Sequence, residues 1–170
     1  VPVPEICPHD DLQPLDRALR QLDSYNWLIV TRANTVRALV ERSAAVELVF
    51  AANSSLKVAA IGTATATEAL NAGLSVALVP ENYVGESLVE SLAGQVAGRK
   101  ILLARAAVAR DVIPDALRAA GAVLDVVDAY RNRMPESAPI QLRQALQTGV
   151  DAATFTSSSS VTHLADAARA

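Results

Sequence analysis

The stretch "YNWLIVTRANTVRAL" (Tyr25 to Leu39) decides the fold, because it joins an apolar run, a polar turn and a helical pattern without a break. The run "WLIV" is short and continuously apolar, which is typical of a strand covered on both faces of a sheet. Val36, Leu39 and Val40 then recur at three- and four-residue spacing, which predicts a helix that we expect to extend to Leu48. Strand, turn and helix in this order favour a parallel sheet.

The same pattern repeats along most of the chain. Apolar runs predict further strands, and amphipathic stretches predict helices between them. The predicted strands are "KVAAIG" (57–62), "SVALVP" (75–80), "KILLAR" (100–105) and "AVLDVVDAYR" (122–131), and the predicted helices cover 12–23, 63–74, 84–98 and 109–121. This alternation predicts an α/β protein with a parallel sheet and helices on both faces.

The composition narrows the class of function. The 170 residues have a net charge of −3 and are 51% hydrophobic, which suits a globular core and argues against a nucleic-acid scaffold. Cys7 is the only cysteine, so a disulfide within the chain is impossible, and with only His9 and His163 it cannot build a metal cluster. No apolar run is long enough for a membrane span. We expect a soluble cytoplasmic protein without a metal.

The alternation of strand and helix patterns is interrupted after Arg131, where "NRMPESAP" (132–139) is a polar, proline-containing connection. Beyond it the pattern predicts a helix over 140–147, a strand over 152–156 and a helix from Val161 onward. Three such elements cannot enclose a core by themselves. Because the chain also begins with Val1 instead of Met, we expect a fragment that self-associates through exposed apolar faces.

An internal match links the two ends of the pattern. At an offset of 125 residues, Thr31 falls on Thr156, Val36 on Val161, and Leu39 on Leu164. In each copy hydroxyl residues stand where a helix begins: Thr31 with Asn34–Thr35 in the first, and Ser157–Ser160 in the second. Such positions either cap the helix or leave N–H groups free for a ligand. The serine run could also be a flexible linker.

Five segments together resemble one known family, the uroporphyrinogen-III synthases. They occur in the family's order and cover nearly the whole chain: "DSYNWLIVTRANTVRAL", "KVAAIGTATATEALNAGL", "VPENYVGESLVESL", "ILLARAAVARDVIPDALRAAGAVLDVVDAYR" and "FTSSSSVTHL". The resemblance implies two flavodoxin-like α/β domains, one inserted into the other. It would make residues 1–9 a connector strand, 10–127 the complete inserted domain, 128–138 the second connector, and 139–170 part of a second, incomplete domain.

The family's reaction needs no cofactor and no metal. It converts linear hydroxymethylbilane into uroporphyrinogen III, with loss of water and inversion of ring D, in haem biosynthesis. The resemblance therefore implies a cyclising lyase with a small-molecule substrate and no nucleic-acid or membrane partner. The full-length family member is expected to be monomeric.

The resemblance also implies site residues. Tyr130 matches a tyrosine proposed to assist departure of the hydroxyl group, although it could be an ordinary strand tyrosine. The implied substrate-binding residues are Thr31, Arg32, Thr63, Thr65, Ser157 and Ser158. The threonines could instead cap helices. Arg32 stands where the family commonly has serine, so it could contact a carboxylate or be a surface charge. A further Gly-x-x-Thr segment of the family would lie beyond Ala170.

Two other classes of function stay open on the sequence alone. One is a non-catalytic module of the same fold, regulatory or tetrapyrrole-binding, or an inactive truncated fragment. The other is a flavin or nucleotide site at "GTATAT" (62–67). The sequence argues against it, because no G-x-G-x-x-G or Walker pattern follows any of the predicted strands.

Overall fold

The computed structural model describes residues 4–50, 55–109, 112–155 and 157–169. The chain divides into two compact units. We call residues 8–130 the sheet unit, and residues 1–7 with 131–170 the tail unit. The described elements, in chain order, are β1 (Glu5–Pro8), α1 (Gln13–Arg20), a 3-10 turn η1 (Leu22–Ser24), β2 (Trp27–Val30), α2 (Ala33–Ala45), β3 (Lys57–Ala60), α3 (Thr63–Asn71), β4 (Val76–Leu78), α4 (Gly85–Ser91), β5 (Lys100–Ala106), α5 (Val112–Ala119), β6 (Val123–Arg133), α6 (Ala138–Thr148) and α7 (Ser158–Arg169).

The sheet has the strand order β1-β6-β5-β2-β3-β4. Strand β2 pairs in parallel with both β3 and β5, and the pairs β3–β4 and β5–β6 are also parallel. The chain therefore moves outward from β2 to β4, then returns to the other side of β2 and moves outward again. This reversal confirms the predicted α/β sheet. Counted along the chain, the five parallel strands lie in the order 3-2-1-4-5, whereas flavodoxin itself has 2-1-3-4-5.

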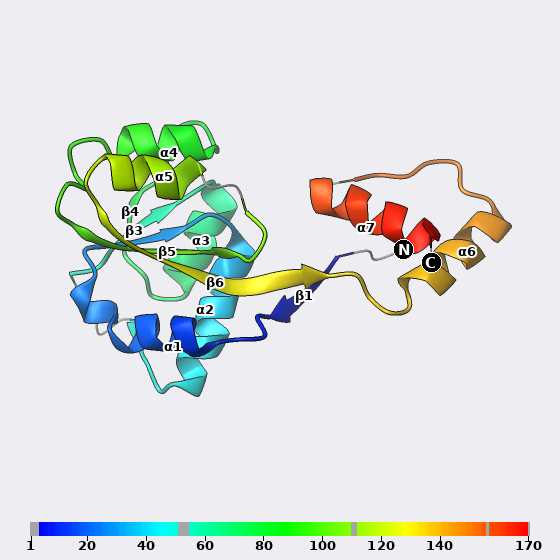
Figure 1. Ribbon diagram of the computed structural model, residues 1–170, viewed down its shortest axis with the longest axis horizontal. Helices are drawn as coiled ribbons and strands as arrows, with labels where there is room; N and C mark the ends of the chain where they lie inside the picture. Colours follow the sequence, from blue (N-terminus) through cyan, green and yellow to red (C-terminus); the bar gives the residue numbers. More distant parts are fainter. Residues whose placement is uncertain (1–3, 51–54, 110–111, 156, 170) are drawn as a thin grey trace. The chain divides into compact units, whose positions relative to one another are not determined.

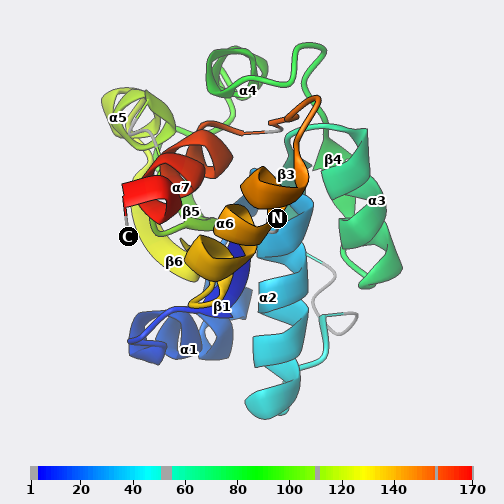
Figure 2. The same ribbon diagram turned by 90° about the vertical axis from the view of Figure 1, so that its right-hand side faces the viewer.

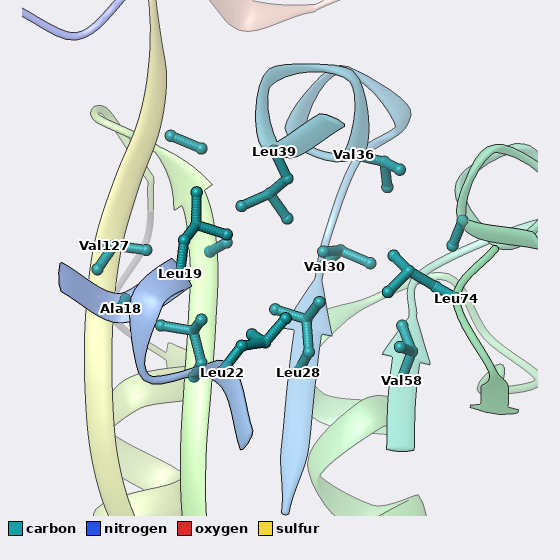
Figure 3. Close-up of a cluster of buried hydrophobic side chains, with 14 of the residues drawn as sticks. Ala18, Leu19, Leu22, Leu28, Val30, Val36, Leu39, Val58, Leu74 and Val127 are labelled. Carbon is teal, nitrogen blue, oxygen red and sulfur yellow. The ribbon is translucent and has the colours of Figure 1, made fainter. Parts of the chain in front are cut away.

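Helices cover both faces of the sheet unit, as the sequence predicts. Helices α1, α2 and α3 lie on one face, and α4 and α5 lie on the other (Figure 1). Each face has its own apolar cluster. Val30, Val36 and Leu39 belong to the first cluster (Figure 3), and Ile29, Leu88 and Leu103 belong to the second. Strand β2 is buried on both faces because its successive side chains point to opposite faces of the sheet and pack alternately into the two clusters.

The helices of the sheet unit end earlier than the sequence predicts, and α2 and α4 are two examples. Helix α2 stops at Ala45, so Leu48 lies outside it. Glu47 takes a positive φ of 56°, a left-handed conformation that ends a helix although glycine is its usual occupant. Helix α4 stops at Ser91 and does not reach Gly98. Pro114 is tolerated inside α5 because it stands in the first turn, where backbone N–H groups have no helical partner.

The tail unit holds β1, the end of β6, and a pair of helices. An ion pair of 3.1 Å joins Arg133 of β6 to Glu5 of β1. Helices α6 and α7 lie side by side (Figures 1 and 2). The strand predicted over 152–156 is wrong for its described part, because residues 152–155 are irregular. A strand needs a hydrogen-bonded neighbour, and the described residues of the tail unit offer no further strand to pair with it. Thr156 lies outside the described residues.

Candidate functional site

The candidate site lies at the carboxyl edge of the parallel sheet, where β2, β3 and β5 end and where β6 leaves its pairing with β5. Helices α2 and α3 begin at this edge, directly after β2 and β3. Open parallel sheets bind ligands here, next to the strand where the order reverses, because helix N-termini present unpaired N–H groups. In this sheet the reversal falls between β2 and β5.

Tyr130 stands on β6 at this edge. It is paired in register with Ala106 of β5, and its carbonyl oxygen accepts a hydrogen bond of 2.9 Å from the Ala107 N–H. Its exposed fraction is 2%, so the phenol is shielded from water. Burial raises the pKa of Tyr130, while the charge of Arg32 and the hydroxyl of Thr35 oppose that rise. The phenol therefore keeps its proton at neutral pH, with two groups beside it that favour the ionised form.

The start of α2 supplies those two groups. Arg32 is the N-cap residue, with extended backbone angles, and its side chain is exposed and makes no cap hydrogen bond. Thr35 is the third residue of the helix and is fully buried. Thr31 links β2 to the helix and is half-buried. The structure thus brings Arg32 together with Tyr130 and leaves Thr31 beside them in sequence.

The start of α3 places its two predicted threonines differently. Thr63 is the first residue of the helix and is exposed, whereas Thr65 is buried at 4% exposure. Gly62 precedes the helix with φ 87° and ψ 153°, a region that is essentially restricted to glycine. The ring of Tyr83 packs over Gly62, 3.6 Å from where a Cβ would lie. At this helix, Thr63 is open to a ligand and Thr65 is not.

The serine run is a helix start, not a linker. Ser157 Oγ accepts a hydrogen bond of 3.3 Å from the Ser160 N–H, and Ser160 Oγ accepts one of 3.3 Å from the Ser157 N–H. This reciprocal arrangement is a capping box. The hydroxyl of Ser160 also donates to the Ser157 carbonyl oxygen at 2.6 Å. Ser158 begins α7, and its side chain lies outside the described residues.

Thr35 is not among the substrate-binding residues that the resemblance implies, although it stands at the helix start in the first copy of the internal match. Its signal is the alignment itself, because the same offset pairs Thr35 with Ser160. Arg105 also lies near this edge, with its Nε 3.7 Å from Oδ1 of Asp128 on β6. Within the described ranges, no three His, Cys, Asp or Glu side chains are grouped to hold a metal ion, and no helix is long and apolar enough to cross a bilayer.

These features define a doubly wound α/β protein with a buried phenol, an arginine and two helix N-termini at the ligand-binding edge of its sheet. The family model described as "Uroporphyrinogen-III synthase HemD" matches residues 1–170. The chain belongs to this family.

Comparison with individual proteins agrees with that assignment. The uroporphyrinogen-III synthase of Synechococcus elongatus is 34% identical over 166 residues, which cover 95% of this chain and 61% of the relative. Two crystal structures of uroporphyrinogen III synthase from Thermus thermophilus, a mutant and the wild type, align with TM-scores of 0.70 and 0.68. Their identities are 21% and 25%, and 98% of this chain covers 66% and 65% of theirs. The chain thus spans less than two thirds of the length of these relatives.

Proposed function

We propose that the protein containing this chain is a uroporphyrinogen-III synthase that cyclises linear hydroxymethylbilane, inverts ring D and releases water. The observation that carries the proposal is the surroundings of Tyr130. This phenol is buried and protonated, and it lies at the carboxyl edge beside Arg32 and Thr35 in a chain of the synthase family.

The chemistry asks for an acid at the departing hydroxyl group. Tyr130 would give its proton to that oxygen as the carbon–oxygen bond breaks and the bonding electron pair leaves with the oxygen. Water departs, an azafulvene cation remains on the substrate, and Tyr130 becomes a phenolate next to Arg32. The proton lost from the substrate after ring closure restores the phenol. The larger task is orientation, since the bound tetrapyrrole must close at the inverted position.

The substrate's acetate and propionate carboxylates need hydrogen-bond donors and positive charge. Thr31, Arg32 and Thr63 are our candidates in the sheet unit, because they are exposed or half-exposed where α2 and α3 begin. Backbone N–H groups of those helix starts would add to them. Thr65 would act by supporting the start of α3, since it is buried.

The serines would contribute mainly through the backbone. The capping box occupies the hydroxyls of Ser157 and Ser160 and the Ser160 N–H, which leaves the other N–H groups at the start of α7 as donors. Ser158 stays a candidate contact from the sequence alone.

One assay tests the proposal. Hydroxymethylbilane is supplied to the natural polypeptide that contains these residues, and isomers I and III are resolved by chromatography. We expect isomer III from the wild type and a rate at least tenfold lower from Tyr130→Phe, which keeps the ring but not the proton. Isomer I alone, at the rate without protein, would identify a non-catalytic module of the same family.

We also propose that residues 10–127 form the inserted domain, residues 1–9 and 128–138 the connectors, and residues 139–170 part of the second domain. The division of the described residues into a sheet unit and a tail unit supports this arrangement. In the tail unit Ile140, Leu146 and Val161 are exposed, so the 170-residue chain by itself should self-associate. A monomeric mass by light scattering would contradict that expectation. We expect the natural protein in the cytoplasm, which fractionation with a tagged chain would test.

A further inference from the structure

Thr35 combines complete burial with an unused hydroxyl. Its exposed fraction is 0%, and its Oγ1 has no hydrogen-bond partner within normal geometric limits. A buried hydroxyl without a partner destabilises a folded protein, because it gives up its hydrogen bonds with water. Nothing in the packing of α2 requires a hydroxyl there, since the neighbouring core positions Val36 and Leu39 are aliphatic.

The equivalent position in α7 shows how such a hydroxyl is normally used. Ser160 is the third residue of α7, as Thr35 is of α2, and the internal match pairs the two. Ser160 exchanges hydrogen bonds with the N-cap residue Ser157. In α2 the N-cap residue is Arg32, whose side chain has no acceptor for the Thr35 hydroxyl. Capping therefore explains Ser160 but not Thr35.

Thr35 is one of the two groups that oppose the raised pKa of the buried Tyr130 phenol. The Thr35 hydroxyl lowers the pKa of Tyr130, although its Oγ1 makes no hydrogen bond that meets the usual geometric limits in the structure. Four charged side chains belong to the neighbouring segments: Arg32 before α2, Arg105 on β5, and Asp128 and Arg131 on β6. Among the described residues, Arg32 is the one whose charge also lowers that pKa. Arg105 is turned toward Asp128.

We infer that Thr35 is a positioning residue whose hydroxyl donates a hydrogen bond to the Tyr130 oxygen when that oxygen gives up its proton. This role rests on the proposed function, in which the proton passes from Tyr130 to the departing hydroxyl group and leaves a phenolate. The donor is held ready in a site shielded from water. Such preorganised donors favour the charged form that develops during reaction more than they favour the resting state.

The first test measures the phenol directly and does not depend on turnover. In the natural polypeptide, 3,5-difluorotyrosine is incorporated in place of Tyr130, because the fluorine atoms lower the pH at which the phenol ionises and mark this one position. The phenolate is followed by absorbance and by fluorine NMR. We expect Thr35→Val to raise this pKa by about one unit, as the loss of one donor to an anion predicts. Thr35→Ser, which keeps the hydroxyl, should leave it close to the wild-type value.

The second test asks whether Thr35 acts through Tyr130. T35V should form isomer III about tenfold more slowly, in line with a pKa change of one unit, and T35S should restore most of the rate. T35V should not lower the melting temperature, since it removes an unpartnered hydroxyl.

Three outcomes separate the possibilities. An equal phenol pKa in wild type and T35V would overturn the role of Thr35. The role of Thr35 would also be overturned if T35V lowered the rate of isomer III formation by the same factor in Y130F as in the wild type. A wild-type protein that makes no isomer III would overturn the proposed function alone, because the phenol titration still decides whether Thr35 is a donor to position 130.

Discussion

The hydroxyl of Tyr25 donates a hydrogen bond of 2.6 Å to Oδ2 of Asp125, which lies 100 residues further along the chain. The pair joins the segment before β2 to the start of β6, at the amino edge of the sheet. The Lys100 ammonium lies 4.5 Å from the centre of the Tyr25 ring. Burial and the Asp125 carboxylate both raise the pKa of Tyr25. At Tyr130, on the opposite edge, the neighbouring groups oppose the effect of burial. The neighbours of Tyr25 therefore reinforce the neutral form of its phenol, whereas those of Tyr130 oppose the effect of burial without reversing it.

That contrast supplies a matched pair of substitutions. Tyr25→Phe should lower the free energy of unfolding by about 1 kcal/mol, the usual net value of one hydrogen bond, and should leave the rate of isomer III formation unchanged. Y130F should lower the rate of isomer III formation and leave the free energy of unfolding unchanged. Urea denaturation and the isomer assay, run on both variants, check the prediction. A large loss of activity in Tyr25→Phe would show that the two edges are not independent.

The ion pair between Asp16 and Arg42 predicts a pH dependence of stability. Arg42 donates two hydrogen bonds to the Asp16 carboxylate, of 2.5 and 2.6 Å, and so ties α1 to α2. The hydrogen bond from Arg42 lowers the pKa of Asp16 below its ordinary value of 3.8. A lowered carboxyl pKa stabilises the fold above the unfolded-state pKa, and that stabilisation is lost as the pH falls through the folded-state pKa.

The corresponding experiment compares urea midpoints of the wild type and Asp16→Asn. The wild type should be more stable at pH 7, and the difference should shrink toward zero as the pH is lowered from about 5 to 2. Asp115→Asn is the control, because the pair of Asp115 with Arg118 is longer, at 3.7 Å, and both side chains are largely exposed. A difference that persists at pH 2 would mean that Asp16 stabilises the fold by packing instead of charge.

The apolar cluster under α1, α2 and α3 predicts a large cost for truncation. Leu28 has no exposed surface and belongs to this cluster (Figure 3). Leu28→Ala should lower the free energy of unfolding by about 2–5 kcal/mol. Leu70→Ala, at a helix position that is 58% exposed, should change it by less than about 0.5 kcal/mol. Similar losses in the two variants would contradict the arrangement of the core.

The capping box of α7 predicts a local effect on the tail unit. Ser157→Ala removes the side-chain acceptor for the Ser160 N–H, and such a loss costs about 0.5–2 kcal/mol of helix stability. Hydrogen exchange should therefore quicken in α7 and stay unchanged in the sheet unit. Ser157→Asp keeps a cap and should preserve protection. If Ser157→Asp keeps the exchange protection of α7 but no longer forms isomer III, Ser157 also contacts a carboxylate of the substrate. If hydrogen exchange in α7 is unchanged in Ser157→Ala, Ser157 does not cap this helix.

The strands of the sheet unit could be predicted from the sequence because each is a short apolar run between polar turns. "WLIV" and "KILLA" are buried on both faces, as their continuous apolar character indicates. The end of α2 could not be predicted, since Glu47 takes a left-handed conformation without any glycine or asparagine to signal it. The apolar segment 152–155 was expected as a strand, but pairing needs a neighbour, which a local pattern does not reveal.

The candidate site was partly predictable. Tyr130 and Arg32 were selected from the resemblance, and the structure brings them within electrostatic reach of each other. The burial of Thr65, and the unused hydroxyl of Thr35, depend on which side of a helix meets the sheet. The sequence could not show that Ser160 has a capping partner while its equivalent, Thr35, has none.

The order of the strands has a consequence for synthesis on the ribosome. Strand β2 lies between β3 and β5, and β3 follows it closely in the sequence. Its other neighbour, β5, is complete only when residue 106 has been made. Until then the backbone N–H and C=O groups on that side of the apolar strand Trp27–Val30 have no partner and can pair with another nascent chain. We therefore expect the yield of soluble protein to fall when translation is slowed between β4 and β5, and to recover when general chaperones are supplied.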